Sequence, residues 1–144
     1  MPVRICRISE LVQDEKTSSY AIVRSMKNKS KWIEQLSALS PSKDLFFKYR
    51  NLANNGLWNK TSFNDIYVPQ FITEMHSPEA KASLSDILQR SAKGESIALA
   101  CFCTDETMCH RSIIAGILQG AGVDVETTSN ADYSHFFNIW KNTK

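Results

Sequence analysis

Short segments of apolar residues, alternating with polar ones or running together, predict four β-strands along the chain. Residues 3–8 alternate apolar and basic side chains, so we expect a strand with one less buried face, at or near a sheet edge. Residues 97–103 form an uncharged apolar run, and its shortness and polar flanks favour a buried strand over a helix. The segments 20–23 and 123–127 complete the predicted set.

Apolar residues at helical spacing predict helices between these strands. The first covers residues 32–39, because four apolar residues share one helical face there: Trp32, Ile33, Leu36 and Leu39. A second helix is expected to begin with Ser40 as N-cap and Pro41 at its first position, and to end at residues 54–56. Its predicted buried stripe consists of Leu45, Phe46, Tyr49, Leu52 and Ala53.

The second half of the chain carries clearer helix signals. Ser77 and Pro78 repeat the start signal ahead of an amphipathic helix that closes at residues 93–94, and a further helix follows residue 109. Residues 57–75 are aromatic and less regular, with Pro69 interrupting what otherwise reads as one helix. A last helix, capped by Asp132 or Asn130, is expected to bury four aromatic residues: Tyr133, Phe136, Phe137 and Trp140.

Strands separated by helices indicate one α/β domain over residues 1–144, with a sheet that is at least partly parallel. A chain of 144 residues with 42% hydrophobic and 22% charged residues has the composition of one globular domain. No apolar run approaches the roughly 18 residues of a membrane span, and the N-terminus lacks the apolar core of a signal peptide. We therefore expect a cytoplasmic protein without a membrane partner.

The net charge excludes few classes of binding partner, and the cysteine content bears on the redox state of the thiols. A net charge of +2 does not indicate a nucleic-acid partner, although it leaves one possible. The basic residues Lys27, Lys29 and Lys31 form a solvated loop or, alternatively, a patch that faces phosphate. The four cysteines are expected to be reduced thiols, with Cys6 packed in the core.

The main candidate site lies in residues 101–112, where a strand, a short loop and a helix follow one another. Loops at the carboxyl ends of strands bind ligands in open α/β sheets, and the positive end of the next helix points into the same space. Cys109 lies at that helix start, so we expect a lowered thiol pKa and a nucleophilic role. His110 is the candidate proton carrier, and Arg111 offers a fork of donors for a carboxylate or phosphate.

Further residues are predicted to surround a small anionic ligand. They are Cys103, Asp105, Glu106, Ser112 and Tyr67. Cys103 is expected at the end of the strand, near the ligand, whereas Cys101 is deeper and more typical of packing. Asp105 and Glu106 are either an acid and a base or polar residues that solvate the loop, and Ser112 belongs to the first helical turn.

Two other chemistries remain open for the same cysteines. Cys101, Cys103, Cys109 and His110 are ligand types that suit zinc or an iron–sulfur centre. Against a metal, a Cys-x-Cys pair along an extended strand holds its sulfurs far apart, and structural zinc sites usually space their cysteines by two to four residues. Cys103 and Cys109 are also a candidate pair for a reversible disulfide.

Several common mechanisms lack their motif. A phosphatase loop needs an arginine close after its cysteine, and seven residues separate Cys103 from Arg111. The sequence has no glycine-rich phosphate loop, no G-x-S-x-G and no dinucleotide fingerprint.

The chain resembles the family catalogued as domain of unknown function 488. The resemblance rests on the apolar strand that ends in Cys101, the loop of residues 104–106 and the Cys-His-Arg-Ser sequence of residues 109–112, with weaker similarity in residues 39–45 and 63–75. It implies a single α/β domain with Rossmann-like, three-layer architecture and a site built on Cys109, His110 and Arg111. Members of the family often have an acidic residue where this chain has Cys103, which favours thiol or metal chemistry here.

Together these observations predict a protein that binds a phosphate- or carboxylate-bearing ligand, with thiol catalysis at Cys109. A nucleotide or the end of a nucleic acid belongs to this class of ligand, and the reaction needs no cofactor. The first alternative is a non-catalytic module that recognises an anionic group on a protein or nucleic acid through Arg111. The second is a Cys/His metal-binding protein that holds zinc or an iron–sulfur centre.

Overall fold

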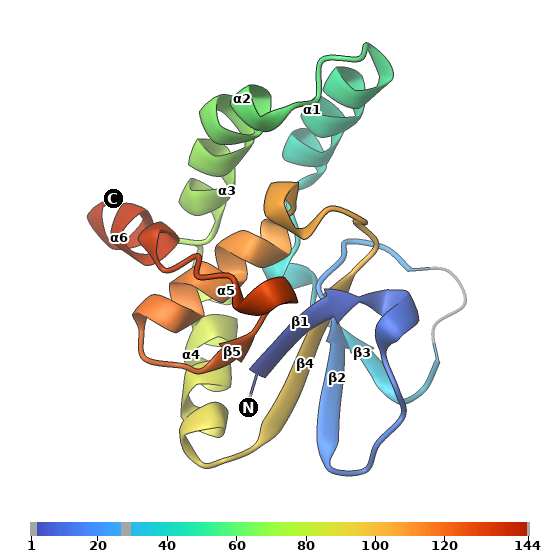
Figure 1. The fold of residues 1–144 in the computed structure, drawn as a ribbon, viewed down its shortest axis with the longest axis vertical. Helices are drawn as coiled ribbons and strands as arrows, with labels where there is room; N and C mark the ends of the chain where they lie inside the picture. The colour runs from blue at the N-terminus through green and yellow to red at the C-terminus, as the bar shows by residue number, and fades with distance from the viewer. Residues whose placement is uncertain (1–2, 27–29, 144) are drawn as a thin grey trace.

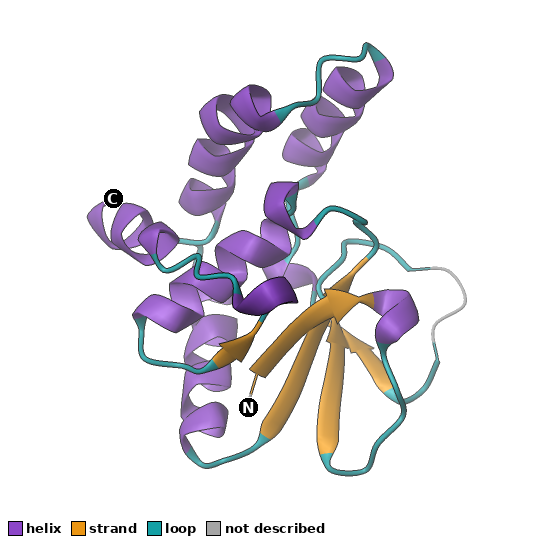
Figure 2. Ribbon diagram, viewed as in Figure 1, coloured by secondary structure: helices purple, strands orange, loops and turns teal. Residues whose placement is uncertain are grey.

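A computed structural model describes residues 3–26 and 30–143, so Lys27 and Lys29 of the predicted basic loop lie outside the described residues. The described chain forms a sheet in the order β3-β2-β4-β1-β5, in which every pair of neighbours is parallel. Figure 2 shows the strands fanned beside a group of helices. The strands are β1 (Val3–Arg7), β2 (Thr17–Ala21), β3 (Ile33–Gln35), β4 (Ser96–Cys101) and β5 (Val125–Glu126). The predicted α/β class is confirmed, and the sheet is parallel throughout.

The α-helices of the described residues are α1 (Lys43–Asn54), α2 (Lys60–Ser62), α3 (Val68–Glu74), α4 (Pro78–Ala92), α5 (His110–Gly120) and α6 (His135–Asn142). Short 3₁₀ turns are η1 (Ile8–Glu10), η2 (Ser37–Leu39), η4 (Glu106–Met108) and η5 (Thr128–Asn130), and η3 (Phe63–Tyr67) is a π-helix. None of the helices in these ranges is long and apolar enough to cross a bilayer.

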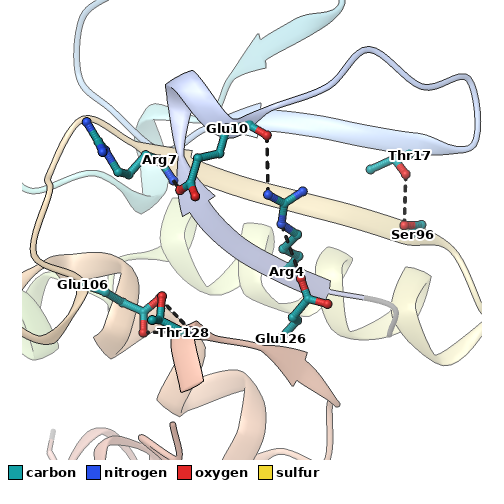
Figure 3. Close-up of polar contacts among 8 residues, drawn as sticks. All are labelled: Arg4, Arg7, Glu10, Thr17, Ser96, Glu106, Glu126 and Thr128. Atoms are coloured by element: carbon teal, nitrogen blue, oxygen red, sulfur yellow. Dashed lines mark hydrogen bonds and ion pairs between the residues drawn. The ribbon is translucent and has the colours of Figure 1, made fainter. Parts of the chain in front are cut away.

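Helices α4 and α5 pack against one face of the sheet, and α6 packs on α5 (Figure 1). The connections from β3 to β4 and from β4 to β5 cross the sheet in the same direction, and right-handed crossovers place their helices on the same side. The opposite face carries the η1 segment, where Arg4 Nη2 and the Arg7 backbone N–H both donate hydrogen bonds to Glu10 (Figure 3). The domain therefore has a helical layer, the sheet, and a thin third layer on the opposite face that consists of a turn and loop.

The central unit follows its local sequence signals. β4 is the central strand, with β1 on one side and β2 on the other, and its apolar run is buried on both faces, as expected for the middle of a parallel sheet covered by other layers. Ser77 caps α4 by accepting a hydrogen bond from the Ala80 N–H, as predicted, and Pro78 occupies the first turn. The predictions of α4 and α5 are confirmed, and the strand predicted over residues 97–103 is present as β4. However, β4 ends at Cys101, so Cys103 lies in the loop and not at the end of the strand as predicted.

The predicted helix over residues 32–39 is wrong. Residues 33–35 form β3, which pairs with β2, and η2 follows directly. The Leu36 N–H continues the ladder by donating to the Ala21 carbonyl at 2.8 Å. The apolar residues have helical spacing, but the segment does not form a helix because a neighbouring strand satisfies its backbone hydrogen bonds.

The helix predicted from Pro41 begins two residues later, with Ser42 as its N-cap. The Ser42 hydroxyl accepts from the Leu45 N–H, and both the hydroxyl and the N–H of Ser42 donate to the Glu74 carboxylate. Only Leu45 of the predicted stripe is buried, and Phe46 is 41% exposed. The stripe prediction is wrong because α1 stands apart from the sheet instead of covering it (Figure 1).

Pro69 does not interrupt the helical path of residues 60–74. The chain widens to a π-helix in residues 63–67, where the Val68 N–H donates to the Phe63 carbonyl, and α3 follows at once. A wide turn ahead of a proline relieves the clash between its ring and the preceding carbonyls. The irregularity predicted for this segment is thus a change of helix type.

The start of the last helix also differs from the prediction. Ser134 is the N-cap residue of α6, and no side chain caps this helix. Asp132, two residues earlier, accepts a hydrogen bond from the Ser134 N–H, and Asn130 lies in η5 with φ of +56°. Two of the four aromatic residues predicted in the core are buried, Tyr133 and Phe136, and the others pack at its edge.

Candidate functional site

Three cysteines and a histidine meet at the carboxyl end of β4. Among the described residues, one donor atom from each of Cys101, Cys103, Cys109 and His110 lies within 4.8 Å of all the others. Cys101 is the last residue of β4 and Cys109 is the N-cap of α5. Cys103 is partly exposed, whereas the other residues of this cluster are buried. We call these residues the Cys/His cluster.

The loop between β4 and α5 is held in place by Glu106. Its buried carboxylate accepts hydrogen bonds from the Thr128 N–H and hydroxyl and from the Tyr133 hydroxyl, at 2.7 to 3.3 Å. Figure 3 shows the contact between Glu106 and Thr128. Asp105 is exposed, and its carboxylate accepts from the N–H and hydroxyl of Thr107. These two acids therefore shape the loop, and neither lines the cavity described below.

His110 has a defined tautomer. Its Nε2 lies 2.7 Å from the Ile22 carbonyl oxygen, which only accepts, so Nε2 carries the proton. Nδ1 then presents its lone pair 3.6 Å from the Cys109 sulfur. Burial lowers the pKa of His110, which favours the neutral ring. The cluster thus contains a neutral imidazole with its free nitrogen turned to the sulfurs.

Arg111 lies behind the sulfurs and is only 3% exposed. Its Nη1 donates to the Cys103 carbonyl at 2.7 Å and to the Cys101 sulfur at 3.3 Å. Within the described ranges no carboxylate forms an ion pair with Arg111, and its buried Nε has no hydrogen-bond partner. A buried guanidinium needs a nearby negative charge, and a thiolate is the group in position to supply it.

The three thiols differ in acidity. Hydrogen bonds from Cys103 and Cys109, together with the positive charge of Arg111, lower the pKa of Cys101. Hydrogen bonding to Cys101 raises the pKa of Cys103 to about 12. Burial, followed by the hydrogen bonds and charge of its neighbours, raises the pKa of Cys109 well above its ordinary value. The cluster therefore holds its first negative charge on Cys101.

The predicted low pKa of Cys109 is wrong for this reason. Cys109 does lie at the start of α5, where the helix favours an anion. However, it is only 1% exposed, and its sulfur lies 3.1 Å from that of Cys101, which takes the charge. Two adjacent thiolates would repel each other, so only one is stable beside a single arginine.

A cavity of about 660 Å³ opens above the cluster. Its floor contains the whole Cys/His cluster, and Tyr67, one of the residues predicted to surround the ligand, lies in its wall. Neither Arg111 nor Ser112 lines it, and the Ser112 hydroxyl donates to the Cys109 carbonyl. Other lining residues were not predicted as site residues: Arg24, Lys43, Phe46, Phe47, Trp58 and Phe102.

One sequence signal pointed to this wall. Phe46 and Phe47 are adjacent on α1, so a single buried face cannot hold both rings. Both are substantially exposed in the structure, and both line the cavity. Aromatic residues at neighbouring helical positions are therefore a signal for a ligand-facing surface here.

Comparison with known proteins identifies a family for most of the chain. A family model with the description "DUF488-N3a: Active DUF488-N3 subclade" matches residues 3–122. The matched range runs from β1 past the end of α5 and contains the Cys/His cluster. No curated protein and no solved structure gives a significant match.

Proposed function

The chain belongs to the DUF488 family, and from this membership we propose that it binds and acts on a small molecule that joins an anionic group to an apolar or aromatic body. The family description calls the subclade active and names no reaction, which is consistent with an enzyme. The chemistry proposed is nucleophilic attack by a cysteine thiolate of the Cys/His cluster on an electrophilic atom of the bound molecule: a bond from sulfur to that atom forms, and the bond from that atom to its leaving group breaks, with the electron pair going to the leaving group.

The cavity is the observation that carries this proposal. A volume of about 660 Å³ suits a small molecule, and its walls present aromatic rings from α1, from Trp58 and from Phe102. Such rings favour an apolar or planar body that stacks against them. Because the Cys/His cluster lines the same cavity, and Cys103 is its most exposed member, a molecule held by the walls lies next to the thiols.

Two positively charged side chains at the cavity are the reason for proposing an anionic group on the ligand. Arg24 and Lys43 both line it, and Arg24 Nε donates to the Pro41 carbonyl at 3.1 Å, which fixes the guanidinium. Phosphate and carboxylate groups are the natural partners of such donors. Arg111 was predicted to bind the anion, but it does not line the cavity. Its Nη1 donates to the Cys101 sulfur, so we assign it the role of stabilising the thiolate.

The reactive sulfur belongs to the pair Cys101 and Cys109. Arg111 favours the thiolate on Cys101, and the Cys109 thiol is 3.1 Å away as a proton donor to that sulfur. His110 Nδ1 is positioned to accept the proton that Cys109 carries. In our proposal Cys109 therefore keeps the catalytic role predicted from the sequence, but shares it with Cys101.

Ligand binding and thiol reactivity test this proposal separately. Nucleoside monophosphates and aromatic carboxylates should raise the melting temperature of the reduced protein, whereas inorganic phosphate alone should not. Iodoacetamide at pH 7 should modify a cysteine of the cluster faster than Cys6, whose pKa burial raises, and a bound ligand should slow that modification.

The outcomes also separate an enzyme from a binding module. Equal, slow labelling of all four cysteines, together with ligand binding, would leave a module that recognises anions without thiol chemistry. The absence of any stabilising ligand in both chemical classes would reject the cavity as the binding site.

A further inference from the structure

The Cys/His cluster has a second property that attack by a thiolate does not use, which is its composition of three sulfurs and one imidazole nitrogen. We propose that Cys101, Cys103, Cys109 and His110 bind one divalent ion of the zinc type as a four-coordinate site. This inference goes beyond the proposed function, because it assigns a metal to residues that thiol chemistry would use without one.

The donor separations bracket those expected around a single ion. Zinc bonds of about 2.3 Å to sulfur and about 2.0 Å to nitrogen in a tetrahedron separate two sulfurs by about 3.8 Å and sulfur from nitrogen by about 3.5 Å. In the structure Cys109 Sγ and His110 Nδ1 are 3.6 Å apart, the Cys101 and Cys109 sulfurs are 3.1 Å apart, and every donor lies within 4.8 Å of the others.

The objection drawn from the Cys-x-Cys spacing does not apply to this loop. The strand ends at Cys101, so Cys103 lies beyond it, in irregular backbone. Its side chain is therefore not held in the alternating geometry of a strand, and its sulfur reaches the other three donors.

His110 is oriented as a metal ligand. In protein metal sites a ligating histidine commonly donates its second ring N–H to a backbone carbonyl or carboxylate, which fixes the ring and the free lone pair. The Nε2–H bond to the Ile22 carbonyl at 2.7 Å does this, and Nδ1 faces Cys109. This orientation is independent of the spacing of the sulfurs.

Charge balance agrees with the same assignment. Three thiolates and a divalent ion carry a net charge of −1, which the buried Arg111 cancels through its N–H bond to the Cys101 sulfur. Binding would form three M–S bonds and one M–N bond, and it would displace the protons still on the thiols to solvent. The oxidation state of the ion does not change.

The donor set also selects the kind of metal. Thiolate and imidazole favour zinc over magnesium or calcium, which prefer oxygen. A polynuclear iron–sulfur cluster places several iron and sulfide atoms among its ligands, which needs more room than four donors within 4.8 Å leave. We therefore infer one ion, with cobalt(II) as a suitable spectroscopic probe for zinc.

A titration of the full-length, reduced, chelator-treated chain with cobalt(II) tests the site. We expect one cobalt per chain, with sulfur-to-cobalt charge-transfer absorption in the near ultraviolet, visible bands typical of tetrahedral cobalt, and loss of both on adding zinc. Cys103→Ser is the informative variant because Cys103 is the least buried of the ligands, and it should weaken binding by about 10-fold or more. Cys6→Ser is the matched control, since Cys6 lies in β1 outside the cluster, and it should bind cobalt like the natural chain.

Two results would overturn the inference: no charge-transfer absorption in the folded natural chain, or equal cobalt affinity in the natural chain and Cys103→Ser. Neither result bears on the proposed function when the ligand stabilisation is measured on the same chelator-treated chain. Conversely, cobalt binding without any stabilising ligand would support the metal site and reject the proposed function.

Discussion

Arg111 Nη1 lies 3.3 Å from the sulfur of Cys101, and both residues are buried. The arginine follows Cys109 and His110 in the first turn of α5, whereas the cysteine ends β4, so the contact joins the two elements on either side of the loop. Because no carboxylate in the described part of the chain pairs with this guanidinium, the sulfur is its counter-charge. This contact is one of the interactions that stabilise a thiolate on Cys101, beside the hydrogen bonds from Cys103 and Cys109.

Replacing Arg111 with Gln should raise the pKa of Cys101, because the thiolate loses the positive charge that stabilises it. A lowered pKa means that the thiolate persists as pH falls, so the natural chain should react with iodoacetamide well below the ordinary thiol pKa. In Arg111→Gln the pH profile of the reaction should move to higher pH by the size of the shift, and the rate at pH 7 should fall about 10-fold for each unit by which the pKa rises above 7. The pH profile of alkylation and of thiolate absorbance near 240 nm measures this.

Arg24→Gln is the control for that variant, since Arg24 lines the cavity but does not contact the sulfurs in the described structure. It should leave the thiol titration unchanged. Arg111→Lys keeps the charge, so it should restore part of the effect. An unchanged titration in Arg111→Gln would show that the thiolate is stabilised by another group.

Helices and strands that are marked by residues within or next to them, such as a capping residue or an apolar run, were predicted from the sequence. Ser77 and Pro78 start α4 by capping and backbone restriction, and the apolar run of β4 reports burial on both faces. A helix was predicted for the segment 33–35 because its apolar residues have helical spacing. Its pairing partner, β2, lies more than ten residues away in the sequence. Propensity within a window contains no information about such a partner.

The candidate site was predicted in location but not in its internal arrangement. The position of Cys109 and His110 at a loop–helix junction follows from the chain itself. The closeness of Cys103 to the other donors depends on where β4 ends, and the role of Glu106 depends on Thr128, 22 residues further along the chain. Both facts arise from tertiary packing, which a single sequence leaves open.

Glu106→Gln should destabilise the protein by about 1–3 kcal/mol. All three partners of this carboxylate, two groups on Thr128 and the Tyr133 hydroxyl, are donors. An amide would present its own N–H₂ to one of them, leaving a buried donor unsatisfied. Urea unfolding measures the change, and Asp105→Asn, on the exposed neighbour, should shift stability by less than about 0.5 kcal/mol. Equal stability of the two variants would contradict the anchoring role of Glu106.

Lys43→Glu should weaken binding of an anionic ligand without affecting the fold. Lys43 is exposed at the start of α1 and lines the cavity. Reversing a charge at this rim changes the interaction by about 1 kcal/mol, which is about 5-fold in Kd, and high salt should reduce the difference. Calorimetric titration with a ligand identified in the thermal screen measures it. Lys81→Glu, on the exposed side of α4, makes the same change in net charge and should bind like the natural chain.

Gly116→Ala tests the packing that holds the C-terminal helix against α5. In an exposed helix this change stabilises by about 1 kcal/mol, because alanine has the higher helix propensity. Here a Cβ on Gly116 would lie 2.0 Å from the Tyr133 carbonyl oxygen and 3.0 Å from the Phe136 Cβ. Backbone cannot move aside as a flexible side chain does, so we expect a loss of at least about 2 kcal/mol in urea unfolding. Ala82→Gly, at an exposed position of α4, should show the ordinary propensity cost of about 1 kcal/mol. A stabilised Gly116→Ala protein would mean that α5 and α6 do not pack at this distance.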